Sequence, residues 1–499
     1  MADRLGLTVA SVEVLLATGL TLLFLEDKSL WLDEVTSIVI ARNWASMWQD
    51  MVQHEANMWL YYVLLHFWLK LGESEFLVRS LSASFAVVTV PVAYALGTRL
   101  FGPRVGIVTA LLLPVNAFFI HYAQEARSYS LLVLMTTLSS YFFARGIERP
   151  SWKYWGACMV SSVLAIYAHF FGALVLIAHA TSLVFLRRRD IPWRNLAVNY
   201  VATALLLLPL VLFQPFGSGQ TGWIRQPEAK DIGRLFLALA GSRRNLLLVY
   251  AALCFAAWGS AVVRSLRFKQ SLETWRYAFL TTWLLVPVAI AFSFSLLAKP
   301  LFVARYLIIC LSPLVLLAAV GLSNITQRWL FTTTLAMLII LSGSGLSSWY
   351  TGYEKEDWRG ATRFVLSEAQ PGDAVFFYAS SVRKPFEYYL DRFNAPSPFL
   401  SPMELASSPY APGGGGQVSA SHQRQLGHLP TEDTRVWLVL SHDSVLHGGR
   451  DVKSRLIQES LARKYTTVRE RKFKGIRVLL YERAFFQVET ASSRCQESH

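Results

Sequence analysis

Apolar segments long enough to cross a membrane restrict the fold of this chain more than any other feature. Runs of roughly 17 to 25 apolar residues, the length that spans the hydrocarbon core as a helix, recur from the N-terminus to about Tyr350. Only 16% of the 499 residues are charged, whereas a soluble protein usually carries about 25%. The sequence therefore predicts a polytopic α-helical membrane protein. Its predicted spans, about eleven in all, begin near residues 6, 76, 105, 129, 154, 172, 197, 245, 277, 303 and 328.

Basic residues lie mainly in the short loops on one side of these spans. They are Arg4, Arg99, Arg104, Arg145, Arg149, Lys153, the RRRD segment at 187–190, Arg194, Arg264, Arg267, Lys269 and Arg328. By the positive-inside rule this side is cytoplasmic. We expect a multi-pass protein of the inner (plasma) membrane, with a cytoplasmic N-terminus and everything after the last span outside. The net charge of +14 then reflects topology, and no nucleic-acid partner is expected.

The chain becomes clearly more polar after about Thr351. In this tail, EDWRGATRFVLSEA and VKSRLIQESLARK have the pattern of helices, and GDAVFFYAS, TRVWLVLSH and KGIRVLLYER the pattern of strands. Alternating helices and strands indicate a small α/β domain. We therefore expect a transmembrane domain over 1–350, with interfacial helices in its outer loops, and a soluble extracytoplasmic α/β domain over 351–499.

The first outer loop contains a segment with helical periodicity. In TSIVIARNWASMWQDMVQ the apolar residues recur at helical spacing; they are Ile40, Trp44, Met47, Trp48 and Met51. This pattern predicts an amphipathic helix that lies in the outer interface, with its tryptophans at headgroup depth.

Charged residues on the outer side are candidates for function, because ionisable groups at membrane depth are costly and topology does not explain them there. Asp33 and Glu34 follow the first apolar run directly. The other candidates are His54, Glu55, the segment HYAQEARSY at 121–129, Arg225, Lys230, Arg243, Arg244, Lys299 and Arg305. Carboxylates can accept protons, and Lys or Arg can hold an anion such as the phosphate of a lipid.

Each of these groups also has a structural interpretation. Asp33 and Glu34 could cap and stabilise the start of an interfacial helix. His54 and Glu55 could be ordinary interfacial residues, and Glu125 with Arg127 a pair at a helix entry. Arg305 could extend outward as a packing residue, although a guanidinium at this depth is suited to bidentate contact with phosphate oxygens.

Four segments in this order resemble a known family. They are LWLDE at 30–34, HEANMWLYYVLLHFWLKLGESEFLVRSLSA at 54–83, YAQEARSYSLLVL at 122–134 and FVARYL at 302–307. The resemblance is to bacterial C-type (GT-C) glycosyltransferases, in the family-39-like group related to protein O-mannosyltransferases and aminoarabinose transferases, and it covers about residues 1–350. Relatives usually have His-Pro-Pro where this chain has HEANMWLYY, a departure that bears on His54 and on acceptor specificity.

The resemblance implies a glycosyltransferase, of hexosyl or pentosyl type, that moves a sugar from a polyprenyl-phosphate donor to an acceptor hydroxyl on the outer side, with inversion. The acceptor would be a lipid, a glycan or a protein. Asp33 is the expected base, with Glu34 as a second catalytic residue. Together with the position of the outer charges, the resemblance indicates these substrate-binding residues: His54, Glu55, Tyr122, Gln124, Glu125, Arg127, Arg225, Lys299, Arg305 and Tyr306.

Two other functions stay open at this stage. A transporter or flippase for a lipid-linked or anionic substrate would also need charges in the membrane, but in this chain they gather at one face. A transferase that uses lipid-linked oligosaccharide pyrophosphate would usually need a divalent metal. The sequence shows no CxxC motif and no convincing set of carboxylate ligands, so we expect no metal site and no required cofactor, with a divalent metal as the open alternative.

Overall fold

The chain forms two units, and the structure is a computed structural model. It describes residues 2–53, 57–213, 224–267, 272–352, 355–378, 382–394, 402–404, 435–441, 452–463 and 465–483. One unit comprises Met1–Lys28 and Asp33–Glu354, and the other comprises Ser29–Leu32 and Lys355–His499. The second unit thus includes four residues that the sequence places in the first outer loop.

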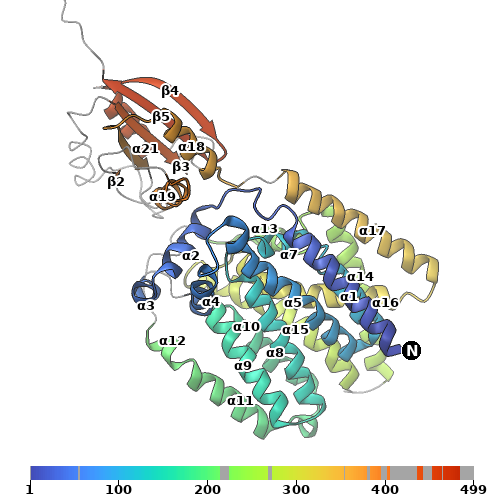
Figure 1. Ribbon diagram of the computed structural model, residues 1–499. Helices are drawn as coiled ribbons and strands as arrows, with labels where there is room; N and C mark the ends of the chain where they lie inside the picture. The colour runs from blue at the N-terminus through green and yellow to red at the C-terminus, as the bar shows by residue number, and fades with distance from the viewer. Residues whose placement is uncertain are drawn as a thin grey trace, which may run out of the picture. The chain divides into compact units, whose positions relative to one another are not determined.

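The first unit is helical, and many of its helices lie side by side (Figure 1). Its helices are α1 (Ala2–Leu22), α2 (Leu32–Arg42), α3 (Trp44–Gln53), α4 (Trp59–Leu69), α5 (Glu75–Phe101), α6 (Pro103–Leu112), α7 (Ala117–Ala123), α8 (Tyr129–Glu148), α9 (Trp152–Ala168), α10 (Gly172–Ser182), α11 (Trp193–Leu206), α12 (Leu208–Leu212), α13 (Ala229–Leu239), α14 (Arg244–Arg267), α15 (Leu272–Leu297), α16 (Leu311–Ser323) and α17 (Arg328–Ser347). Short 3₁₀ or π segments are η1 (Leu183–Phe185), η2 (Arg188–Asp190), η4 (Tyr306–Cys310) and η5 (Ser348–Gly352).

The structure confirms a multi-pass helical membrane protein. Within the described ranges, six helices are long and apolar enough to cross a membrane, and the bent pair of α6 and α7 would make a seventh. A helix or 3₁₀ segment begins within about five residues of every predicted start. The count of about eleven is not established, because several elements are shorter than a full span. For example, α10 has 11 residues and α11 has 14, and Pro209 lies in the first turn of α12, three residues after α11 ends.

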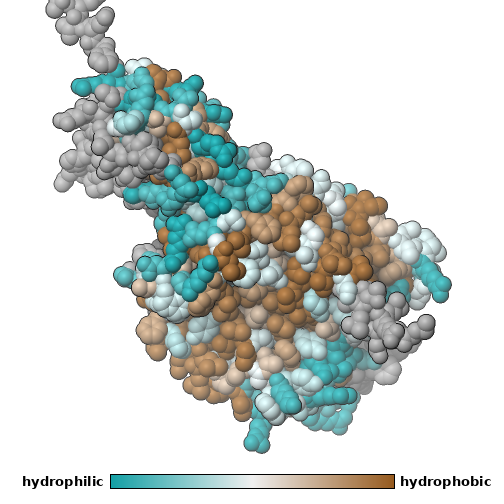
Figure 2. Space-filling view, viewed as in Figure 1, coloured by the Kyte–Doolittle hydropathy of each residue, from teal (hydrophilic) through white to brown (hydrophobic). Residues whose placement is uncertain are grey.

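The outer surface of the helical unit is apolar, as the brown area over much of this unit in Figure 2 shows. Leu15, Leu297 and Ile340 are 70%, 87% and 71% exposed. Such a surface is unfavourable in water, and a bilayer can cover it. The hydrocarbon core of the membrane is therefore the natural solvent for this face.

The bend between α6 and α7 leads to a buried turn that matters for the site. The two helices differ in direction by 64°. Asn116 caps α7, because its side-chain oxygen accepts hydrogen bonds from the N–H groups of Phe118 and Phe119 (2.9 and 3.1 Å). Since α7 ends at Ala123 and α8 begins at Tyr129, residues 124–128 form a turn between them.

The loop after α1, predicted to be the first outer loop, contains α2 and α3 where the sequence predicts one amphipathic helix. Asn43 interrupts it, and its side-chain oxygen accepts a hydrogen bond from Ala45 N–H at 2.9 Å, which caps α3. The break also divides the predicted apolar face. Ile40, Met47 and Met51 are buried, whereas the two tryptophans of this face, 44 and 48 in the sequence, are 42% and 39% exposed.

The second unit contains a five-stranded sheet of order β2-β1-β3-β5-β4 (Figure 1). Its strands are β1 (Ala374–Tyr378), β2 (Pro402–Glu404), β3 (Arg435–Ser441), β4 (Tyr465–Phe473) and β5 (Ile476–Arg483), and its helices are α18 (Trp358–Glu368), α19 (Arg383–Arg392) and α21 (Val452–Ala462). Strand β1 is parallel to β2 and β3, whereas β5 is antiparallel to β3 and β4. Leu438 packs with Leu461 of α21, and the neighbouring Trp437 packs against Phe364 of α18 (5.9 Å between rings). Because successive side chains of a strand point to opposite faces, the two helices cover opposite faces of the sheet.

Candidate active site

Asp33 lies in the first turn of α2, with its carboxylate next to an arginine from the distant FVARYL segment. Arg305 Nη1 is 3.5 Å from Asp33 Oδ2, and the two side chains remain 19% and 27% exposed. Among the described residues, Asp33 has no side-chain hydrogen bond to a backbone N–H group of its own helix. The capping interpretation of Asp33 therefore has no support in this geometry, while a partly accessible carboxylate is suited to accept a proton.

Glu34 points elsewhere and forms a buried, bidentate ion pair with Arg79 of α5. Its two carboxylate oxygens accept from Arg79 Nε and Nη2, each at 2.8 Å, and the side chains are 0% and 1% exposed. Oε1 also accepts from Ala126 N–H at 3.0 Å. Arg79 Nη1 donates in addition to the carbonyl oxygens of Leu25 and Lys28 (2.9 and 2.7 Å).

This ion pair joins three parts of the helical unit: the loop after α1, the start of α2 and the 124–128 turn. Because both oxygens of Glu34 are engaged and buried, the geometry favours a positioning role for Glu34 over a role as a base. The sequence predicts a catalytic role for both acids, and the structure shows that their environments differ.

Arg127, in the 124–128 turn, holds the other side of the same helix start. Its Nη1 donates to the backbone oxygen of Asp33 (3.3 Å) and to Ser37 Oγ (3.2 Å). Ser37 Oγ also donates to that backbone oxygen, at 3.0 Å. The turn itself is fixed by Ser82 Oγ, which donates to the carbonyl oxygen of Arg127 at 3.0 Å. Arg127 therefore contacts the backbone of Asp33, whose side chain is the candidate base.

Three other residues of the YAQEARSY segment have partners of their own. Gln124 Nε2 donates to the carbonyl oxygens of Thr21 and Leu23 (3.1 and 2.7 Å), and its oxygen accepts from Trp349 Nε1 at 2.7 Å. Glu125 Oε1 lies 3.1 Å from His121 Nε2. Tyr122 is buried and stacks on the His121 ring (4.5 Å between centroids). Gln124 thus joins the 124–128 turn to the end of α1 and to η5. Glu125 and Tyr122 instead contact His121 of α7, and the Tyr122 ring also lies 5.0 Å from that of Tyr129.

Tyr129 and His169 complete the group around Arg305. Tyr129 is buried at the start of α8, with its ring 6.1 Å from that of His169. His169, in the break between α9 and α10, lies with its ring 4.9 Å from that of Tyr306. The His169 side chain is buried. The structure thus brings together Asp33, Arg127, Tyr129, His169, Arg305 and Tyr306.

The sequence reasoning did not single out His169 or Arg79. Both are ionisable residues inside apolar segments, in YAHFFGA and FLVRSLSA. The rule that flags charges at membrane depth applies to them as well. Their partners are far away in sequence, so their roles become visible only in three dimensions.

Among the described residues, Arg225 and Lys299 have other surroundings. Arg225 pairs with Asp231 (2.9 Å) and Glu228 (3.9 Å) at the start of α13. The side chain of Lys299 is exposed. His54 and Glu55 lie outside the described residues.

No group of three or more His, Cys, Asp or Glu side chains that could hold a metal occurs in the described parts of the chain. The site described above contains one partly exposed carboxylate and two arginines.

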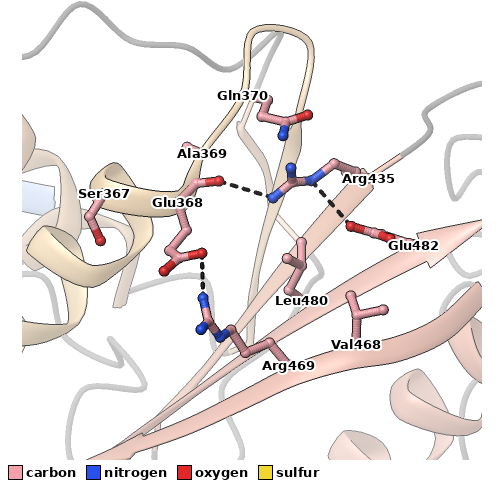
Figure 3. Close-up of a pocket in the computed structure, with 9 residues that line it drawn as sticks. All are labelled: Ser367, Glu368, Ala369, Gln370, Arg435, Val468, Arg469, Leu480 and Glu482. Atoms are coloured by element: carbon pink, nitrogen blue, oxygen red, sulfur yellow. Dashed lines mark hydrogen bonds and ion pairs between the residues drawn. The ribbon is translucent and has the colours of Figure 1, made fainter.

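The C-terminal unit has a shallow pocket of about 610 Å³ (Figure 3). It is lined by Ser367, Glu368, Ala369, Gln370, Arg435, Val468, Arg469, Leu480 and Glu482. Arg435 donates to the Glu368 carbonyl oxygen at 3.0 Å and lies 3.8 Å from Glu482, and Arg469 pairs with the Glu368 carboxylate. Carboxylates thus balance both arginines of this pocket.

Comparison with known proteins agrees with the resemblance noted from the motifs. Residues 58–217 match the family model described as dolichyl-phosphate-mannose-protein mannosyltransferase. This segment includes Arg79, Arg127 and His169 but neither Asp33 nor Arg305. No curated protein matches the chain significantly in sequence.

The fold is that of the GT-C glycosyltransferases. The crystal structure of ArnT from Cupriavidus metallidurans bound to undecaprenyl phosphate superposes with a TM-score of 0.63 at 14% identity, over 94% of this chain and 97% of that chain. The apo structure of the same protein gives a TM-score of 0.62 at 14% identity, over 96% of this chain and 98% of that one. At this identity the similarity shows the fold, and it confirms the resemblance to this group.

Proposed function

We propose that this protein is an inverting glycosyltransferase that moves a sugar from a polyprenyl-phosphate donor to an acceptor hydroxyl on the extracytoplasmic side of the inner (plasma) membrane. The observation that carries the proposal is the partly exposed Asp33–Arg305 pair, 3.5 Å apart, with Arg127 bound to the backbone of Asp33. The fold supports it, since the ArnT structure with the same fold holds undecaprenyl phosphate.

The two charged groups suit the two halves of such a transfer. Asp33 accepts the proton of the acceptor hydroxyl while the hydroxyl oxygen forms a bond to the anomeric carbon of the donor sugar. The bond from that carbon to the phosphate oxygen breaks, and the lipid phosphate keeps the electron pair. Arg305 stabilises the negative charge that develops there. A single displacement of this kind inverts the anomeric centre.

A bound donor must separate the ion pair. The phosphate takes the guanidinium of Arg305, and the sugar lies between the phosphate and Asp33. In the absence of substrate, the carboxylate of Asp33 stays paired with the guanidinium of Arg305. The donor sugar is a hexose or pentose, and the acceptor is a lipid, a glycan or a protein.

Deletion of the gene tests the proposed function directly. A deletion strain should accumulate a polyprenyl-phosphate sugar and lose one sugar from an envelope lipid, glycan or glycoprotein, as measured by mass spectrometry. Wild-type protein should reverse both changes. If the protein is instead a flippase, its deletion should leave the lipid-linked sugar in the inner leaflet. Purified protein added to cell extracts should then leave the sugar–phosphate bond intact. Failure of purified protein to release the lipid phosphate would therefore contradict the proposal.

Arg305→Lys is expected to weaken binding of undecaprenyl phosphate about tenfold, because lysine keeps the charge but loses the planar pair of donors. Isothermal titration calorimetry of the detergent-solubilised protein measures the dissociation constant. Arg234→Lys is the matched control, since Arg234 is 59% exposed and pairs with Asp231 at 2.8 Å. Equal affinities of Arg305→Lys and wild type would remove Arg305 from the phosphate site.

The proposed topology has the N-terminus in the cytoplasm and the C-terminal unit outside, because the Lys and Arg residues of the short loops gather on one side. A reporter that is active only outside the cytoplasm should be active when fused after His499. A reporter that works only in the cytoplasm should be inactive at the same position. The opposite pair of results would place Asp33 on the cytoplasmic side and contradict the proposed reaction.

A further inference from the structure

The four residues before Asp33 have their contacts in the C-terminal unit. Ser29–Leu32 group with Lys355–His499, whereas the chain on both sides of them belongs to the helical unit. The C-terminal unit therefore has a short segment of the first outer loop as one of its own elements. The next residue along the chain is Asp33.

Tyr389 of α19 holds this segment by its backbone. The Tyr389 hydroxyl oxygen accepts a hydrogen bond from Leu30 N–H at 2.7 Å and another from Ser29 Oγ at 3.1 Å. Ser29 Oγ in turn accepts from Arg359 N–H of α18 at 3.1 Å. Leu30 and Tyr389 are 0% and 2% exposed, so these hydrogen bonds are shielded from water.

We propose that Tyr389 is a positioning residue for Asp33. The helix that carries Asp33 begins at Leu32, only two residues after the backbone that Tyr389 holds. Chain connectivity passes any displacement of Leu30 to the first turn of α2. Arg127 fixes the same turn from within the helical unit, through the Asp33 carbonyl oxygen. The catalytic consequence rests on the proposed function, whereas the ordering of residues 29–37 does not.

The physical basis is the sensitivity of a transfer reaction to the position of its reacting groups. A displacement of about 1 Å in a reacting group can cost about 10²-fold in rate. Without the Tyr389 hydroxyl, the buried N–H of Leu30 has lost its acceptor. Because an unpaired buried N–H is costly, residues 29–32 are expected to shift until this N–H reaches water or another acceptor. The C-terminal unit thus takes part in the reaction through order in residues 29–32, without contributing a group that touches substrate.

Tyr389→Phe removes the hydroxyl and keeps the ring. Tyr388→Phe is the matched control, because Tyr388 is the adjacent buried tyrosine of the same helix, 3% exposed, with its ring 5.1 Å from that of Tyr389. Hydrogen–deuterium exchange of the full-length protein in nanodiscs follows the amides of residues 29–37. In Tyr389→Phe these amides should exchange at least about tenfold faster, with strands β1 and β3 as protected as in wild type. Ser29→Ala should raise exchange in the same peptide, which covers the case in which Tyr389→Phe does not fold.

Donor binding and the rate of transfer provide the second measurement. Binding of undecaprenyl phosphate, used as the probe, should be unchanged in Tyr389→Phe, while kcat of transfer falls about ten- to a hundredfold at an unchanged KM for the donor. Unaltered exchange at 29–37 in Tyr389→Phe, with β1 and β3 still protected, would overturn the proposal. If Tyr389→Phe loses protection throughout the C-terminal unit, unaltered exchange at 29–37 in Ser29→Ala would overturn it instead. If the wild type transfers no sugar, the proposed function fails, and the exchange measurement still decides the positioning.

Discussion

Replacement of Asp33 by asparagine is expected to leave a folded protein that binds undecaprenyl phosphate and transfers sugar about 10² to 10⁴ times more slowly. The amide is nearly the same size as the carboxylate and can accept a hydrogen bond, but it cannot take the proton of the acceptor. Turnover of purified protein, with donor binding measured on the same sample, separates loss of chemistry from loss of binding.

Asp27→Asn is the matched control for this variant. Asp27 lies in the same loop, is exposed, and undergoes the same replacement of a carboxylate by an amide. Its turnover should equal that of wild type. A capping role for Asp33 predicts near-normal turnover and a small loss of stability, so full activity of Asp33→Asn would defeat the assignment. Glu34→Gln would then be the next variant to measure.

Replacement of Arg79 by methionine is expected to destabilise the helical unit by about 3–5 kcal/mol, because it leaves the Glu34 carboxylate buried without its counter-charge. Activity should also be lost, since Glu34 ties the start of α2 to the rest of the unit. Thermal unfolding in detergent and transfer activity measure the two effects.

The exposed pair of Arg42 and Glu73 provides the comparison. Its distance is 2.7 Å, similar to that of the buried pair, but its side chains are 34% and 33% exposed. Arg42→Met should therefore cost less than about 1 kcal/mol. The double variant Arg79→Met, Glu34→Leu should be more stable than Arg79→Met alone. If Arg79→Met proves no less stable than Arg42→Met, the ion pair has no structural importance.

The membrane part of the fold was largely predictable from the sequence, because long apolar runs have few alternatives to helices. The starts of the helices follow from these runs. Their ends and breaks do not: α9 ends where the backbone of His169 becomes extended, and Asn43 starts a new helix by capping α3, features that an apolar run conceals. Strand β4 was not predicted either, since most of YTTVRERKF is exposed and lacks the apolar alternation of a half-buried strand.

The candidate site was predictable in part. Hydropathy and charge predict that Asp33 and Arg305 lie on the same side of the membrane, and their proximity is consistent with the family resemblance. The contrast between Asp33 and Glu34 is not visible in sequence, because adjacent residues of a helix point about 100° apart and so meet different surroundings. The same limit applies to Arg79, whose four acceptor groups come from two separate segments.

The split make-up of the C-terminal unit has a consequence for biosynthesis. Its first segment leaves the ribosome early, and residues 33–354 must follow before the next part of the same unit exists. At about 5–20 residues per second, these 322 residues take roughly 16 to 64 s. During that interval the helices enter the membrane while Leu30 lacks Tyr389. Order next to Asp33 is therefore among the last features to form, and a chain that stops before α19 would insert in the membrane with its outer loop unfinished.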